Sequence, residues 1–248
     1  MSGHSKWSTI KRKKGATDAK RSKAFSRVIK EISVAVKNGG GIDPKSNPAL
    51  RMAISNAKGV NMPKDNIERA INKASDTDGN KLSEITYEGY GPHGVAIFLE
   101  CTTDNLKRTV SNVRAAFTRS GGALGTNGSL EFLFDRKGVF TVPTLDLAED
   151  EFTLEVIDGG AEEVEKVDEV FIVYTSFEDF GTMQKKLEDM GIQPENAELQ
   201  RVPAVFKAIR VADAKKVLKV IDLFEEDEDV QNVFHNLEIT DDLLNEME

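Results

Sequence analysis

Residues 18–38 read DAKRSKAFSRVIKEISVAVKN, and their pattern organises the first third of the chain. At 100° per residue, the apolar residues fall in one sector of about 120° and the basic residues in an opposite sector of about 100°. The apolar set is Phe25, Val28, Ile29, Ile32, Ala35 and Val36, and the basic set is Lys20, Lys23, Arg27, Lys30 and Lys37, with Arg21 near the apolar edge. Since Thr17 or Asp18 can cap this segment and the glycines at 39–41 end it, we predict a helix with one packing face and one basic face.

Two shorter amphipathic segments follow, at 47–59 and 63–74. Pro48 lies in the first turn of one segment and Pro63 opens the other. The apolar residues at helical spacing are Leu50, Ala53, Ile54 and Ala57 in the first, and Ile67, Ala70, Ile71 and Ala74 in the second. We therefore predict a helical bundle over 17–76, with a basic arm at 1–16 before it and a polar linker after it.

Charge is divided sharply along the chain. Of the 33 basic and 42 acidic residues, 17 basic and 5 acidic ones lie in residues 1–73, a net charge of +12. The other 175 residues hold the remaining 16 basic and 37 acidic ones, a net charge of −21. Because the basic residues are both abundant and arranged in a row, this division favours contact with a polyanion over a merely uneven surface. The predicted nucleic-acid-binding residues are Lys6, Lys11, Arg12, Lys13, Lys14, Lys20, Arg21, Lys23, Arg27 and Lys30.

After the bundle the pattern changes to strands alternating with helices. The expected order is a hairpin turning at 91–94, helix 104–119, strand 130–134, a strand–helix–strand–helix–strand series over 138–202, strand 205–211, helix 213–226, strand 230–237 and an acidic tail. This order predicts an α+β fold in which the three-helix bundle precedes two two-layer, ferredoxin-like domains. We assign 77–134 plus 203–248 to one domain and 135–202 to a domain inserted into it.

Catalytic and metal-binding patterns are lacking in the sequence. The histidines at 4, 93 and 235 are far apart and have no metal-ligand spacing. Cys101 lies in an alternating strand, where an inert small hydrophobic residue is the expected role. The acidic run 225–229 is typical of a solvated turn, and the glycine-rich stretch 121–128 leaves a helix and enters a strand, the reverse of a phosphate-binding loop. We expect no enzyme activity, no metal and no cofactor.

The remaining composition indicates a water-soluble cytoplasmic protein. No window approaches the roughly 18 apolar residues of a membrane helix, and no secretory signal is present. A single cysteine suits a reducing compartment. Three features of the first third stay open: Trp7 can stack on a base or pin the arm to the bundle, His4 can contact phosphate, and 61–66 can dock phosphate or simply begin a helix.

Four segments resemble the YebC/PmpR family. They are GHSKWSTIKRKKGATDAKRSKAF at 3–25, NPALRMAISNAKGVNMPKDNIERAI at 47–71, YEGYGPHGVAIFLECTTDN at 87–105 and VRAAFTRSGGALGTNGSLEFLF at 113–134. The resemblance implies three domains, the third inserted into the second, and carries the family's basic positions onto Lys6, Lys11, Lys14, Lys20, Arg21 and Lys23. Lys107-Arg108 departs slightly from the usual Asn-Arg. Since the motif begins at Gly3, we expect a bacterial cytosolic member without a mitochondrial presequence.

The resemblance leaves two functions open. Members are commonly described as DNA-binding transcriptional regulators, whereas a related branch contains the mitochondrial translational activator of cytochrome c oxidase and bacterial members are linked to translation on the ribosome. A lysine row contacts phosphate rather than base edges, so it does not separate promoter DNA from ribosomal or messenger RNA. We favour a DNA-binding transcriptional regulator over an RNA-binding translation factor. A protein partner on the acidic domains is also open, although a pure adaptor would leave the basic helix without a role.

Overall fold

The computed structural model describes residues 18–76, 82–144 and 147–246, so the predicted arm at 1–16 lies outside the described residues. The described chain forms two compact units. Unit 1 combines residues 18–76 with 136–200, and unit 2 combines 82–135 with 201–246. We describe each unit by itself. The division into domains made from the sequence stays a prediction.

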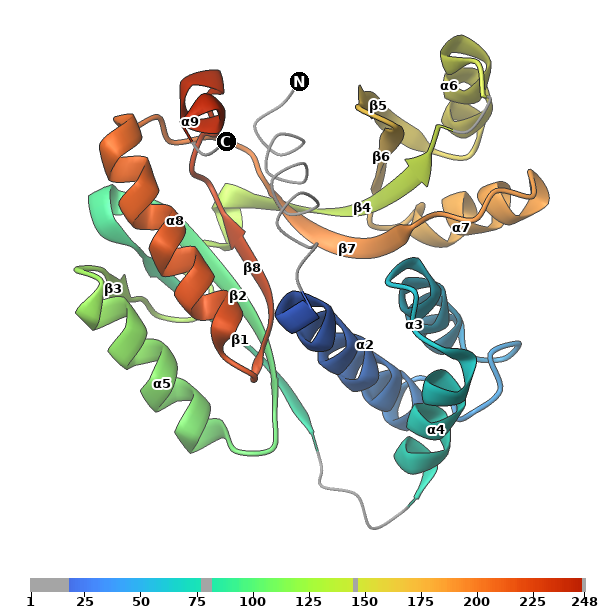
Figure 1. Cartoon of the computed structure of the whole chain (residues 1–248), viewed down its shortest axis with the longest axis horizontal. Helices are drawn as coiled ribbons and strands as arrows, with labels where there is room; N and C mark the ends of the chain where they lie inside the picture. Colours follow the sequence, from blue (N-terminus) through green and yellow to red (C-terminus); the bar gives the residue numbers. More distant parts are fainter. Residues whose placement is uncertain (1–17, 77–81, 145–146, 247–248) are drawn as a thin grey trace. The chain divides into compact units, whose positions relative to one another are not determined.

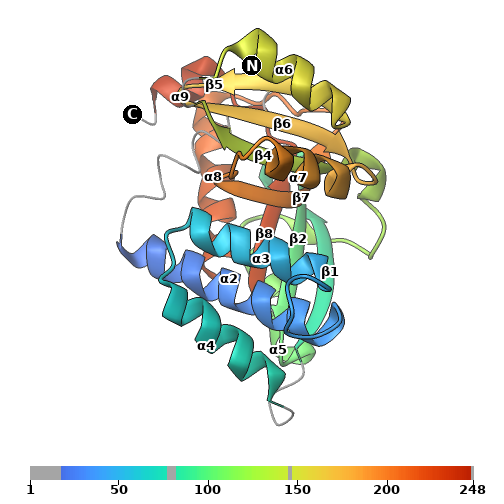
Figure 2. The same cartoon turned by 90° about the vertical axis from the view of Figure 1, so that its right-hand side faces the viewer.

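Unit 1 begins with the predicted three helices, α2 (Asp18–Asn38), α3 (Pro48–Gly59) and α4 (Lys64–Ser75) (Figures 1 and 2). Asn47 fixes the start of α3, since its Oδ1 accepts a hydrogen bond from Leu50 N at 3.0 Å. Its Nδ2 donates to the carbonyl oxygens of Ala35 at 2.7 Å and Gly41 at 2.8 Å. One buried side chain thus caps α3 and holds it against the end of α2.

The predicted apolar faces form the core of this bundle. The buried residues are Val28, Ile32, Ala35, Val36, Leu50, Ala53, Ala57, Met62, Ile67, Ala70 and Ala74, with Phe25, Ile54, Val60 and Ile71 packed against them. Ile29 departs from its predicted inward position, because 39% of it is exposed. The three-helix bundle is therefore confirmed.

The second part of unit 1 contains a four-stranded antiparallel sheet with two helices. In chain order the elements are β4 (Phe134–Pro143), α6 (Glu149–Asp158), β5 (Ala161–Val167), β6 (Val170–Ser176), α7 (Phe180–Asp189) and β7 (Asn196–Pro203). The strand order β5-β6-β4-β7 with this β-α-β-β-α-β sequence is the ferredoxin-like arrangement. Its core includes Phe140, Phe152 and Phe171, and the rings of Phe152 and Phe171 stack at 4.6 Å.

Unit 2 contains the other four-stranded sheet, in the order β3-β1-β2-β8. Its elements are β1 (Ser83–Tyr90), η1 (Pro92–Gly94), β2 (Ala96–Thr103), α5 (Leu106–Arg119), β3 (Ala123–Leu124), η2 (Glu131–Leu133), α8 (Val211–Glu226), β8 (Val230–His235) and α9 (Asp241–Asn245). β1 and β2 pair antiparallel across the predicted hairpin turn, with Tyr90 opposite Ala96.

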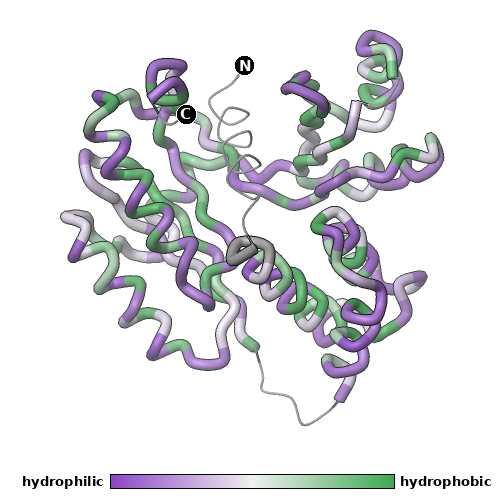
Figure 3. The backbone as a smooth tube through the Cα atoms, in the orientation of Figure 1, coloured by the Kyte–Doolittle hydropathy of each residue, from purple (hydrophilic) through white to green (hydrophobic). Residues whose placement is uncertain are grey.

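Helices α5 and α8 lie side by side on one face of this sheet (Figure 1). Bands of hydrophilic and hydrophobic residues alternate along both helices, as expected where one helix face is buried (Figure 3). The ring centroids of Phe117 on α5 and Phe224 on α8 are 4.7 Å apart, so these two side chains pack against each other. The α+β class with an N-terminal bundle and two antiparallel sheets is thus confirmed.

Three local predictions in unit 2 were wrong. Residues 205–211 form no strand: Lys207 makes one isolated parallel bridge to Leu237, and α8 begins at Val211. Residues 131–133 form a short 3-10 helix before β4 begins at Phe134, and part of the expected acidic tail forms α9. At 205–211 the local pattern was misleading, because the backbone of Lys207 bonds to the distant residues Asn236 and Glu238. The helix α9 is instead capped locally by Thr240, whose Oγ1 accepts from Leu243 N at 3.3 Å.

Candidate nucleic-acid interface

The basic side of α2 is the candidate site, and the structure shows it only in part. Lys6, Lys11, Arg12, Lys13 and Lys14 lie outside the described residues, and the side chains of Lys20 and Arg21 are likewise not described. The other predicted residues are Lys23, Arg27 and Lys30, which lie on the side of α2 away from the buried Val28 and Ile32. The structure places these three on one helix, as predicted, with each side chain partly buried.

Arg27 and Glu31 show why this side of α2 is not uniformly exposed. The Nε atom of Arg27 is buried, and Glu31, one turn later, is itself half-buried. The pKa of Glu31 is raised to about 7, chiefly by burial and also by the charge of Glu198, while the hydrogen bond from Asn56 and the charge of Arg27 act in the opposite direction. Near neutral pH this carboxyl is therefore only partly ionised, and it offsets less of the positive charge on α2 than its sequence count suggests.

The surroundings of Glu31 come from α3 and β7 of the same unit. Asn56 Nδ2 donates to Glu31 Oε2 at 3.4 Å, while its Oδ1 accepts from Ala197 N at 3.0 Å. Close by in sequence, Gly59 lies so near the strand that a Cβ there would collide with the carbonyl oxygen of Glu195. One flank of the bundle is thus packed against the start of β7, which restricts where a ligand can approach α2.

Further cations of the bundle were not among the predicted site residues. Lys37, Lys45, Lys58, Lys64, Arg69 and Lys73 are all exposed. At the start of α4, Arg69 donates to Asn66 Oδ1 at 2.9 Å and to the carbonyl of Asp65 at 3.1 Å. This is an ordinary helix start held by its own side chains, which favours the structural interpretation of residues 61–66. Apart from Lys37, these cations lie outside α2 and add positive charge elsewhere on the bundle.

Unit 2 holds a second basic group, centred on a buried carboxylate. Asp213 Oδ2 accepts from Arg210 Nη2 at 2.9 Å and from Arg210 Nε at 3.1 Å. Its Oδ1 accepts from Lys216 Nζ at 2.9 Å and lies 3.4 Å from His93 Nε2. The sequence signal for this group is a stretch, 201–221, with six basic residues and Asp213 as its one acid.

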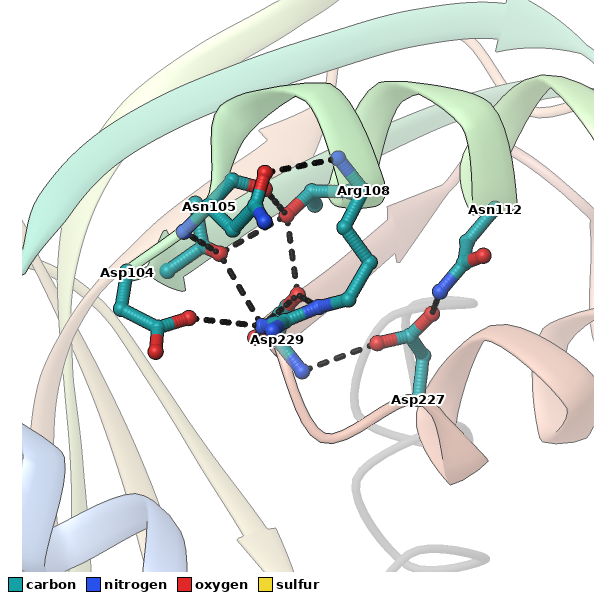
Figure 4. A network of polar contacts seen from close by, with 8 residues as sticks. Asp104, Asn105, Arg108, Asn112, Asp227 and Asp229 are labelled. Carbon is teal, nitrogen blue, oxygen red and sulfur yellow. Dashed lines mark hydrogen bonds and ion pairs between the residues drawn. The ribbon is translucent and has the colours of Figure 1, made fainter.

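A different polar network corrects the interpretation of the acidic run 225–229. Asp229 is buried, and its Oδ2 accepts from Arg108 Nη2 and from Thr109 Oγ1, each at 2.9 Å (Figure 4). Burial alone would raise the pKa of Asp229, but the hydrogen bonds of Arg108 and Thr109 and the charge of Arg108 lower it overall. The end of this run is therefore a structural clamp between α5 and β8 rather than a solvated turn.

The structure also describes Cys101, the possible metal ligands and the candidate membrane helices that the sequence analysis considered. Cys101 is buried in β2, with 2% exposed. Within 18–76, 82–144 and 147–246 no group of three or more His, Cys, Asp or Glu side chains is placed to hold a metal ion. In the same ranges no helix has the length and apolar character needed to cross a membrane.

The bundle, the two antiparallel sheets and the basic α2 together define a three-part α+β protein with its cations concentrated near the N-terminus. The family model described as TACO1/YebC protein N-terminal domain matches residues 5–77, and the one described as TACO1/YebC second and third domain matches residues 82–237. The chain belongs to the TACO1/YebC family, as the resemblance predicted.

Individual relatives agree along nearly the whole length. A protein of Amoebophilus asiaticus named "Probable transcriptional regulatory protein" is 50% identical over 240 residues, which cover 96% of this chain and 98% of that protein. A similarly named protein of Geobacillus kaustophilus is 50% identical over 241 residues, covering 96% of this chain and 98% of that protein. The crystal structure of a conserved hypothetical protein from Aquifex aeolicus matches with a TM-score of 0.83 and 43% identity, covering 92% of this chain and 94% of that one.

Proposed function

We propose that this protein is a cytoplasmic, non-enzymatic regulator of transcription that contacts the phosphate backbone of DNA through its N-terminal arm and α2. The observation that carries the proposal is the placement of Lys23, Arg27 and Lys30 along one side of α2, opposite the face that forms the bundle core. The names of the relatives support a regulatory role.

The physical argument is one of charge. Phosphates are closely spaced along a duplex, so a row of cations on a helix meets several at once and releases their condensed counterions. The cations at 6–14 would add further phosphate contacts. Binding of this kind positions the protein without reading base sequence. If six to ten phosphates are neutralised, affinity is expected to fall by about 10³–10⁵ between 50 and 200 mM salt.

An RNA-binding role in translation is the second candidate. It is favoured by the same observation, because backbone contacts suit structured RNA as well as DNA. In this case the acidic α+β domains would present a surface to a protein of the translation machinery. The comparison of duplex DNA with structured RNA as ligands separates the two roles.

The test is a charge-reversed α2 that keeps the bundle folded. We would change Lys20, Lys23 and Lys30 to Glu and leave Arg27 intact, because its Nε is buried. The matched control changes the exposed Lys58, Lys64 and Lys73 to Glu, with the same change in net charge. Binding of labelled duplex DNA and of a ribosomal RNA stem-loop would be followed by fluorescence anisotropy, and folding by circular dichroism.

The expected result is that the α2 variant loses binding over the whole salt range while the control loses much less. Stronger binding to the RNA stem-loop than to DNA would favour the translation role. Equal loss in both variants would show that net charge rather than α2 governs binding. Undiminished binding in the α2 variant would contradict the proposal.

A further inference from the structure

Basic residues gather around Asp213, although residues 74–248 carry a net negative charge overall. Arg210, Lys216 and His93 all approach this one carboxylate. Lys207, in the segment before α8, also lies beside this turn. Its Nζ would be 3.4 Å from a Cβ added to Gly94, the neighbour of His93. We name these four residues, His93, Lys207, Arg210 and Lys216, the hairpin–α8 cluster.

The cluster is held in place rather than scattered. Asp213 is 5% exposed, and its pKa is lowered by the hydrogen bonds from Lys216 and Arg210, so it stays ionised. Lys207 is positioned by its backbone, because its N–H donates to Asn236 O at 2.6 Å and its carbonyl accepts from Glu238 N at 3.0 Å. Two segments far apart in sequence, the β1–β2 turn and the start of α8, thus present their cations together.

The charge balance distinguishes this group from a structural clamp. In the same unit, Arg108 pairs with both Asp229 and Asp104, so in that clamp one cation faces two carboxylates. Asp213 instead faces Arg210 and Lys216, with Lys207 nearby, which leaves a net charge of +2 before any protonation of His93. Crowding several cations around one carboxylate costs electrostatic energy unless a further anion joins them.

The cations also keep their outer faces available. The side chain of Arg210 is 87% exposed and that of Lys216 is 66% exposed, although both bind Asp213. A guanidinium carries five N–H donors in a fixed fork, so the two nitrogen atoms of Arg210 that contact Asp213 leave donors for a second acceptor. One turn after Lys216 on α8, Lys219 is exposed as well. The dipole of this 16-residue helix adds positive potential at the same end.

We infer that the hairpin–α8 cluster is a second phosphate-binding surface, through which unit 2 contacts the backbone of the nucleic acid bound by the N-terminal region. This inference rests on the proposed function. A nucleic acid fits better than an acidic protein, because phosphates match the Arg fork and recur along the ligand. Two attachment points on one chain also raise affinity through effective concentration.

The test removes cations that Asp213 does not need. Lys207 and Lys219 would both be changed to Glu, which preserves the hydrogen bonds of Arg210 and Lys216 to Asp213. The matched control changes Lys166 and Lys185 to Glu, both exposed in the inserted domain. The slope of log affinity against log salt would be measured for the full chain with duplex DNA and with the RNA stem-loop. Thermal melting would verify folding, and the corresponding Gln variants would replace any variant that melts early.

If the cluster and the neighbouring Lys219 bind phosphate, the Lys207/Lys219 variant loses about 2 from the magnitude of the salt slope, while the control keeps the wild-type slope. An unchanged slope in the Lys207/Lys219 variant, together with loss of binding in the α2 variant, would overturn the inference and leave the proposed function standing. Failure of the wild-type chain to bind either nucleic acid would refute the proposed function and this inference with it. Binding of polyglutamate through the cluster in preference to both nucleic acids would assign the surface to an acidic protein and overturn the inference.

Discussion

Thr109 Oγ1 donates a hydrogen bond to Asp229 Oδ2 at 2.9 Å and lies 2.8 Å from Thr103 Oγ1, so one buried hydroxyl joins α5, β2 and the turn before β8. Arg108 binds the same carboxylate from the solvent side, and Asp104 contacts Arg108 at 2.8 Å (Figure 4). The network connects residues 103–109 to residue 229, in the two separate sequence segments that make up unit 2.

Replacing Thr109 by Val tests this network with little change in volume. The Asp229 carboxylate would lose a donor in a buried position, which is expected to reduce the free energy of unfolding by about 1–3 kcal/mol. Urea denaturation measures the effect. The control is Thr118→Val on the exposed side of α5, where we expect a change within about 0.5 kcal/mol. Similar losses in the two variants would mean that the hydroxyl of Thr109 has no special role.

Glu31 predicts an unusual dependence of stability on pH. Its pKa of about 7 in the folded protein lies above the ordinary value of 4.5, so the folded state binds more protons than the unfolded state between these pH values. Stability from this group is therefore present below about pH 4.5 and is lost as pH rises toward 7. Glu31→Gln should remove the loss, and stabilise the protein by about 1–3 kcal/mol at pH 8 relative to wild type.

The measurement is urea denaturation at pH 5 and pH 8 for wild type and Glu31→Gln. Glu68→Gln on the exposed side of α4 serves as the control, because that carboxylate pairs only with Lys64 at 3.6 Å among the contacts of the described residues. The benefit of Glu31→Gln should appear at pH 8 and be much smaller at pH 5. An equal effect at both values would contradict the raised pKa.

Gly59 is predicted to be intolerant of a side chain. A Cβ at this position would meet the backbone of Glu195, which can move only if α3 or β7 shifts. Gly59→Ala should therefore destabilise the protein by about 1–3 kcal/mol, despite the higher helix propensity of Ala. Gly181→Ala in α7 is the matched control, since nothing lies within 4 Å of its added Cβ. Thermal melting should show opposite signs for the two variants, and a stabilised Gly59→Ala would mean that α3 and β7 do not pack as described.

Asn47 combines two roles that different substitutions can separate. Asn47→Ser keeps an oxygen to cap Leu50 N but loses the amide that binds Ala35 and Gly41, whereas Asn47→Ala loses both. We expect both variants to be less stable than wild type. The free energy of unfolding of Asn47→Ala should be lower than that of Asn47→Ser by about 0.5–2 kcal/mol, the usual contribution of a helix cap. Urea denaturation checks the order, and equal stability of the two variants would show that the cap contributes nothing.

Much of the bundle follows from local sequence. The sector pattern of 18–38 predicted α2 and its end at Asn38, and Asn47-Pro48 predicted the start of α3. These features depend on residues within one or two helical turns of each other, where periodicity and capping are informative. The prediction failed where a segment's conformation depends on distant partners, as at 205–211, which runs beside residues 236–238 instead of forming a full strand.

The candidate site divides in the same way. The sequence predicted a basic side of α2. It could not predict the raised pKa of Glu31, because Glu198 and Asn56, which affect that pKa, are distant from Glu31 in the chain. The hairpin–α8 cluster was missed because a regional net charge of −21 hides a local excess of cations, and because His93 is 120 residues from Asp213. The dense basic stretch at 201–221 was the available signal.

By itself, the sequence determined where the longer helices lie, which residues form most of their apolar faces, where the basic residues concentrate and which family the chain resembles. Those properties arise from neighbours along the chain, since side-chain periodicity and capping act over a few residues. Only the tertiary structure decided which charges are buried and which cations share a carboxylate, because electrostatic energy depends on distance and solvent exposure, which chain order does not specify.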